Sequence, residues 1–194
     1  MHNGLNTLYS ALLQPQKINI PYLGYSLMAV LFTWLLHEFT HWVTSEGLGY
    51  DSVLRLNSVY ALKGQQPTVV HKLLISVSGP VITVLQAFIV FLWLRFSKWK
   101  MHVYPFLLTP LYMRFMAGFM NSIKPNDEGK VSEFLGLGLY NLSIFVCILL
   151  FIWVYSISKR YILSWKFNGG SLLLILLFSS ALILFDQFFK LQFL

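Results

Sequence analysis

The stretch Trp34-Leu35-Leu36-His37-Glu38-Phe39-Thr40-His41-Trp42 sets the pattern for the whole chain. It places a His-Glu-x-x-His signature inside a run of residues that is apolar enough to cross a membrane. Residues four apart on an α-helix lie one above the other, so His37 and His41 can direct two imidazoles at one metal ion. Glu38 lies about 100° further round the helix, next to that ion. A zinc hydrolase needs two neutral nitrogens that hold the ion and a carboxylate that takes a proton from its water.

The same residues also allow a purely structural interpretation, a polar cluster within a helical bundle. An ionisable residue near the bilayer centre costs at least about 2.5–3.5 kcal/mol on insertion scales, so such residues are rare there and are usually functional. No neighbouring Lys or Arg in the sequence neutralises Glu38. We therefore favour a metal site over a structural cluster.

The composition indicates an integral, multi-pass membrane protein with one compact helical domain over residues 1–194. Of its 194 residues 57% are hydrophobic and 11% are charged, and soluble domains contain about 25% charged residues. The net charge of +7 does not predict nucleic-acid binding, because the basic residues are scattered among apolar segments, as in membrane-flanking loops. We expect no cleaved signal peptide, since the first residues carry no basic region and the first apolar run is too long.

The predicted fold class is an all-α membrane protein. The apolar segments predict five transmembrane helices, over residues 21–44, 69–94, 103–123, 134–156 and 171–189. Leu5, Leu8, Tyr9 and Leu12 follow helical spacing and predict a short amphipathic helix on the membrane surface. Residues 52–61 mix β-branched and polar residues, which predicts a small strand or β-hairpin after the first span. Such a loop either offers a strand edge to an extended substrate or is an ordinary connector.

Polar residues of the first span fall on one side of the helix, which should therefore face the interior of a bundle. These residues are Ser26, Thr33, His37, His41 and Thr44. Arg114, an intramembrane cation, and Asn121 share a face of the third predicted helix.

The adjacent carboxylates Asp127 and Glu128 follow the third predicted span. Alternating spans place this loop and the loop after the first span on the same side of the membrane. The carboxylates therefore approach the histidines from the correct face to supply a third zinc ligand, and the sequence spacing leaves both as candidates.

Three motifs together resemble the site-2 protease family of intramembrane zinc metalloproteases, over about residues 21–130. The first is His37-Glu38-x-x-His41 late in a transmembrane helix. The second, Ser78-Gly79-Pro80-Val-Ile-Thr83, is similar to the family's Gly-Pro-x-x-Asn pattern. The third, Asn121 through Gly129, is similar to its Asn-x-x-Pro…Leu-Asp-Gly segment, whose aspartate is a zinc ligand. Thr83 departs from the family's Asn, and Asp127-Glu128-Gly129 replaces Leu-Asp-Gly; residue type favours Asp127 as the ligand and adjacency to glycine favours Glu128.

The resemblance implies an endopeptidase that cleaves transmembrane segments of other membrane proteins within the lipid bilayer. One Zn²⁺ would be held by His37, His41 and Asp127 or Glu128, and Glu38 would be the general base. Arg114 or Asn121 would stabilise the oxyanion or, as we prefer, brace the ligand loop. The main alternative is a non-proteolytic metal-binding membrane protein, such as a degenerate protease, a carrier or an accessory subunit. A small channel or transporter ranks last, since the sequence has no internal repeat.

The distribution of cations slightly favours a cytoplasmic N-terminus. The N-terminal side of the predicted topology carries Lys17, Arg95, Lys98, Lys100, Lys159, Arg160 and Lys166, and the metal side carries Arg55, Lys63, Lys72, Lys124, Lys130 and Lys190. The oligomeric state, the substrate and its cleavage position do not follow from the sequence.

Overall fold

The computed structural model describes residues 16–193 and is mostly helical, with one small β-hairpin, as predicted. The predicted amphipathic helix around Leu5–Leu13 lies outside the described residues. In chain order the elements are α2 (Ile20–Gly47), β1 (Ser52–Arg55), β2 (Ser58–Ala61), α3 (Val69–Phe96), the 3₁₀ helix η1 (Met101–Val103), α4 (Tyr104–Met120), α5 (Asp127–Phe134), α6 (Asn141–Arg160) and α7 (Trp165–Phe189).

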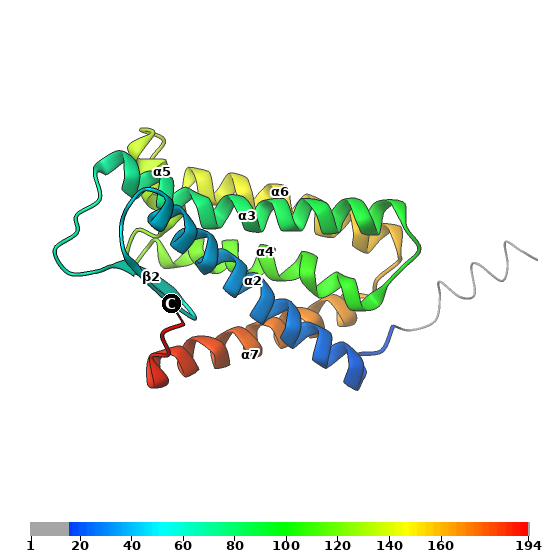
Figure 1. Cartoon of the computed structure of the whole chain (residues 1–194). Coiled ribbons are helices and arrows are strands. Elements are labelled where there is room, and N and C mark those ends of the chain that lie inside the picture. The colour runs from blue at the N-terminus through cyan, green and yellow to red at the C-terminus, as the bar shows by residue number, and fades with distance from the viewer. Residues whose placement is uncertain (1–15, 194) are drawn as a thin grey trace, which may run out of the picture.

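Four of these helices, α2, α3, α6 and α7, are long and apolar enough to cross a membrane, where the sequence predicted five spans. The third predicted span corresponds to α4, which has only 17 residues. At 1.5 Å per residue it is about 26 Å long, shorter than a hydrocarbon core of about 30 Å. It nevertheless packs against α2, α3, α6 and α7 and lies between α3 and α7 in Figure 1.

The fourth predicted span, 134–156, is wrong at its start. Residues 127–134 form the separate helix α5, and α6 begins only at Asn141. Gly136 and Gly138 have φ angles of 68° and 86°, so they lie in the turn that separates the two helices. In the fifth span α7 begins at Trp165 rather than 171, because the Ser164 side chain accepts a hydrogen bond from the Phe167 amide at 3.1 Å and caps the helix.

Successive long helices run in opposite directions through the bundle (Figure 1). The hairpin, α5 and the C-terminus lie at one end, and the α3–α4 and α6–α7 connections lie at the other. The loop after α2 and the loop after α4 therefore lie at the same end, as predicted.

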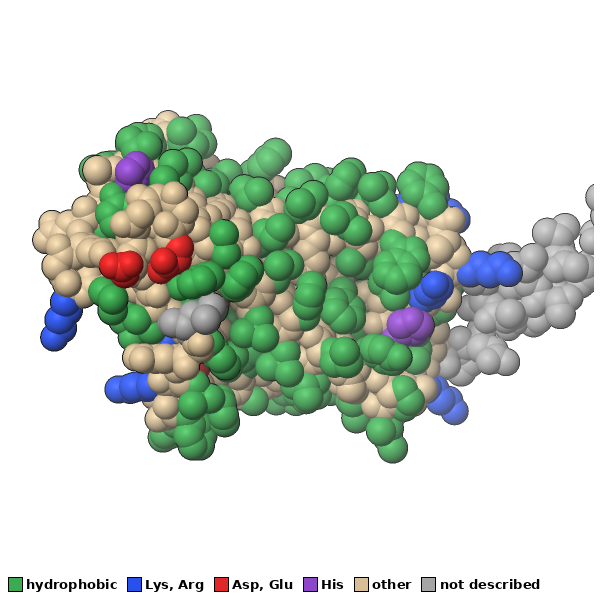
Figure 2. Space-filling view, viewed as in Figure 1, with side chains coloured by type: hydrophobic (Ala, Val, Ile, Leu, Met, Phe, Trp, Pro, Cys, Tyr) green, Lys and Arg blue, Asp and Glu red, His purple; other side chains and the backbone are tan. Residues whose placement is uncertain are grey.

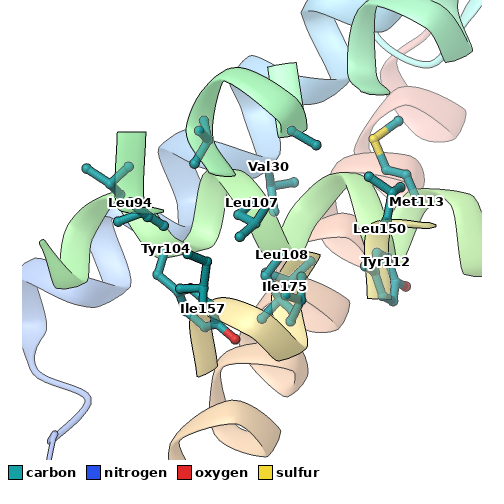
Figure 3. Close-up of a cluster of buried hydrophobic side chains, with 14 of the residues drawn as sticks. Val30, Leu94, Tyr104, Leu107, Leu108, Tyr112, Met113, Leu150, Ile157 and Ile175 are labelled. Atoms are coloured by element: carbon teal, nitrogen blue, oxygen red, sulfur yellow. The ribbon is translucent and has the colours of Figure 1, made fainter. Parts of the chain in front are cut away.

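A buried apolar cluster joins the long helices at the centre of the bundle. Figure 3 shows Val30, Leu107, Leu108, Ile157 and Ile175, which come from α2, α4, α6 and α7 and meet there. Four members of the predicted polar stripe on α2 are buried, namely Ser26, Thr33, His37 and His41, and Thr44 is partly exposed. The polar face of α2 therefore points into the bundle.

The β-hairpin lies alongside the second half of α2. The Trp42 indole donates to the Ser52 carbonyl at 3.0 Å, and the Trp34 indole donates to Asn57, in the hairpin turn, at 2.8 Å. Because Trp34 precedes His37 by one helical turn, a bilayer around α2 would put the hairpin at membrane depth beside the histidines. Non-helical backbone is tolerated at that depth only where protein buries it or where it lines a water-filled cavity.

Candidate metal centre

His37 and His41 on α2 point their rings at one another. Their Nε2 atoms are 3.1 Å apart, and the ring planes are nearly perpendicular, at 86°. Both residues are buried, and they occupy adjacent turns of one helix. The i, i+4 spacing therefore produces the paired arrangement that the sequence predicted.

Asp127 completes a three-residue group that could hold a metal ion. Its Oδ2 lies 3.2 Å from Nε2 of His41 and 3.6 Å from Nε2 of His37. Ligand atoms at 2.0–2.1 Å from a tetrahedral ion are about 3.3–3.4 Å from one another. The three distances between the candidate ligand atoms, 3.1, 3.2 and 3.6 Å, lie on either side of that value. Two imidazoles and one carboxylate are a set of ligands that zinc accepts.

The start of α5 fixes the position of Asp127. Asn126 caps the helix, since its side-chain oxygen accepts from the Gly129 amide at 3.1 Å. Asn121 braces this turn: its Oδ1 accepts from the Asn126 amide at 2.9 Å, and its Nδ2 donates to Ser143 at 3.2 Å. Both ends of the Asn121 side-chain amide are therefore engaged in hydrogen bonds.

The two histidines keep Asp127 ionised. Burial alone would raise the pKa of the Asp127 carboxyl, but hydrogen bonding to His37 and His41 and their charge outweigh burial. The net effect holds the pKa of Asp127 well below its usual range. An ionised carboxylate is the form that binds a metal.

The carbonyl of Ile75 on α3 selects the proton position on His41. Nδ1 of His41 donates to this carbonyl at 2.5 Å, which directs Nε2 at His37 and Asp127, the orientation in which Nε2 would bind a metal. The Ser78 hydroxyl donates to the same carbonyl at 2.7 Å. Pro80 supplies no amide to the carbonyl of Ser76, the residue after Ile75 on α3. Sequence reasoning missed the role of Ile75, because no sequence pattern marks a backbone carbonyl as a partner.

Gly79 lies directly against both histidine rings. A Cβ atom at this position would clash with Nε2 of His41 and would lie 2.6 Å from Cε1 of His37. The Ser-Gly-Pro stretch thus brings the backbone of α3 into contact with the ligand pair, a close approach that only glycine permits.

Glu128 turns away from the metal group and pairs with Arg114. Nη1 of Arg114 lies 3.1 Å from Oε1 of Glu128, and both side chains are almost completely buried. Nη2 of Arg114 also lies 3.4 Å from Nδ1 of His37. A metal on Nε2 of His37 would require the ring proton on Nδ1, and Glu128 would then be the main partner of the guanidinium.

Glu38 lies beside the histidines at the wall of a cleft of about 480 Å³. His41, Asp127 and the whole of β2 line the same cleft. Within the described residues the Glu38 carboxylate has no hydrogen-bond or ion-pair partner, although the residue is only 8% exposed. It is therefore open to a hydrogen-bonding group in the cleft.

Thr83 does not reach the metal group. Its hydroxyl donates to the carbonyls of Gly79 at 3.2 Å and Pro80 at 2.9 Å, within its own helix. The structure thus brings together His37, Glu38, His41, Asp127 and Gly79, places Asn121 and the Arg114–Glu128 pair behind them, and leaves Thr83 outside.

No protein-family model, curated protein or solved structure matches this chain. The resemblance to site-2 proteases therefore rests on the three motifs and stays a prediction.

Proposed function

We propose that this chain is a zinc-dependent intramembrane endopeptidase. The observation that carries the proposal is the unpartnered Glu38 carboxylate beside His37, His41 and Asp127, in one cleft. The three ligands would leave a fourth position open, as catalytic zinc sites do. Zinc held there would supply Lewis acidity and lower the pKa of water to about 7.

Glu38 would serve as the general base. It would accept a proton from the attacking water and return it to the leaving amine. Arg114 and Asn121 would act as braces, because their polar groups are engaged with Glu128 and with the Asp127 turn. A cleft that contains water at membrane depth is required for hydrolysis, and the strand edge along it supports such hydration.

The free edge of β2 supports an extended polypeptide as substrate. The hairpin has two strands, and residues at the C-terminus already occupy the outer edge of β1, where the Phe193 amide donates to the Leu54 carbonyl at 2.9 Å. The β2 residues Ser58–Ala61 line the cleft instead. A transmembrane segment of another protein, locally unwound, would pair with this edge and bring a peptide bond to Glu38.

The proposal is tested with protein reconstituted in vesicles with zinc and quenched-fluorophore transmembrane peptides that carry a central Gly or Asn. We expect cleavage by the wild type, loss of cleavage on zinc chelation, and at least about 10²-fold slower cleavage by Glu38→Gln with its metal retained. Glu133→Gln, which changes an exposed glutamate on α5, is the matched control and should cleave normally.

Wild-type activity in Glu38→Gln would refute the role of Glu38 as base. The alternative, a non-proteolytic metal-binding membrane protein, predicts a different result. The wild type would bind zinc without cleaving any peptide, and every effect of Glu38→Gln would be explained by loss of the metal.

For orientation we propose a cytoplasmic N-terminus, supported by the slight excess of Lys and Arg at that end of the bundle. Single cysteines that replace Lys98 or Lys63, in a Cys147→Ser background, report which side of the membrane each position lies on. An impermeant maleimide should label Lys63→Cys in intact cells and Lys98→Cys only after lysis; the reverse pattern would invert the topology.

A further inference from the structure

One end of the bundle is purely cationic. Seven of the fourteen Lys and Arg residues lie there, at the start of α2 and in the α3–α4 and α6–α7 connections. All seven acidic residues of the sequence lie in the other half of the molecule, where they balance the remaining seven cations. On the face in Figure 2, acidic side chains appear only at the end that carries the hairpin, and the opposite end shows Lys and Arg together with a histidine.

An apolar groove of about 470 Å³ opens near this cationic end, between α4, α6 and α7. Its floor includes Leu108 and Val154, which are buried, and its walls include Tyr155 and Leu172, which are exposed. Along α4 it extends from Tyr104 to Met116, about 18 Å at 1.5 Å per residue. That length is close to the thickness of one leaflet, about half of 30 Å.

Hydrogen-bonded polar groups gather at the cationic end of the groove. Tyr104 donates to Asn168 at 2.8 Å, and Asn168 donates to Ser158 at 2.6 Å. The Ser158 hydroxyl accepts this hydrogen bond. Among residues 16–193 no acceptor faces its own proton. Lys159 follows Ser158 directly, and its Nζ lies 5.5 Å from the ring centroid of Tyr155, on the groove wall. Lys166, also exposed, lies in the first turn of α7, two residues before Asn168.

We propose that this groove binds an anionic phospholipid. One acyl chain would lie along the apolar floor, the Ser158 hydroxyl would donate to an ester oxygen, and the phosphate would lie between Lys159 and Lys166. The sign of charge selects this occupant, because each lysine near an anionic head group adds attraction and this end has no acidic side chain to repel it. A zwitterionic phospholipid gains the apolar contact without the charge.

Native mass spectrometry of the protein in uncharged detergent, with added dioleoyl phosphatidylglycerol or dioleoyl phosphatidylcholine, tests the proposal. We expect the wild type to bind phosphatidylglycerol about ten- to thirtyfold more tightly. Lys159→Gln/Lys166→Gln should abolish this preference. The control Lys63→Gln/Lys124→Gln, which removes two exposed lysines from the other end, should keep it. Leu176→Trp, which fills the groove, should weaken the binding of both lipids.

Three results would overturn the proposal. Equal loss of preference in both lysine pairs would indicate general charge attraction. Displacement of phosphatidylglycerol by glycerol 1-phosphate would indicate a site for soluble phosphates. A dimer that Leu176→Trp dissociates would indicate that a second copy of the chain covers the groove.

Discussion

Gly79 on α3 touches the ring of His41 on α2, and this contact sets the distance between the two helices at the metal group. The Ile75 carbonyl, one turn earlier on α3, orients the same ring. The backbone of α3 at residue 79 therefore determines where the rings of His37 and His41 lie. Any side chain at this position would displace them.

Gly79→Ala should reduce zinc affinity about 10- to 100-fold, as the loss of a group that orients a ligand does, and should destabilise the protein by about 1–3 kcal/mol. The added methyl group pushes the histidine rings out of position. Zinc titration with a competing chelator measures the affinity. Gly24→Ala is the matched control, because its Cβ meets nothing within 4 Å, and it should bind zinc normally. Equal affinities in both variants would show that the contact is unimportant.

The Arg114–Glu128 ion pair should behave as a unit. Arg114→Met leaves the Glu128 carboxylate buried without its partner, so we expect a loss of about 3–5 kcal/mol of unfolding free energy. Arg114→Met/Glu128→Met removes both charges and should recover most of that loss. Unfolding in mixed detergent micelles measures both. A double variant no more stable than Arg114→Met would contradict the pairing.

A second ion pair joins the partly exposed Arg55 of the hairpin to the buried Asp186 of α7. Nη2 of Arg55 lies 3.0 Å from Oδ2 of Asp186 and donates to its carbonyl at 2.7 Å. Arg55→Ala should speed amide exchange across residues 52–61 by tenfold or more, without loss of zinc, because an unpaired buried charge favours opening. Hydrogen–deuterium exchange mass spectrometry reports both strands.

Asp51→Asn is the control for Arg55→Ala. Asp51 accepts a hydrogen bond from Gln65 at 2.7 Å on the exposed surface, where such pairs contribute little. The hairpin amides of Asp51→Asn should exchange at the wild-type rate. An unchanged exchange rate in Arg55→Ala would show that α7 does not hold the hairpin.

Local patterns predicted the features that depend on neighbouring residues. The spacing of His37 and His41, the polar face of α2 and the hairpin at residues 52–61 are properties of short segments, and the structure has all three. The predicted span extends three residues too far, to Ile123, because hydropathy averaged over a window does not register that the chain already turns at Asn121 and Ser122.

Long-range partners could not be predicted. Lys190 lies four residues after Asp186 in the sequence, yet Asp186 pairs with Arg55, 131 residues earlier, because the hairpin folds back onto α7. The choice between Asp127 and Glu128 depends on where α5 begins. Asn126 caps the helix there, and the turn that follows aims Asp127 at the histidines and Glu128 at Arg114.

Zinc content, with the ligand set from X-ray absorption at the zinc edge, tests the metal centre most directly. We predict about one zinc per gently purified wild-type chain, with two nitrogens at about 2.0–2.1 Å and a carboxylate oxygen at about 2.0–2.2 Å. His37→Ala/His41→Ala and Asp127→Ala should lose the ion, and folded Glu128→Gln should keep it. Wild-type protein without stoichiometric zinc, or zinc kept by Asp127→Ala and lost from Glu128→Gln, would contradict the proposed site.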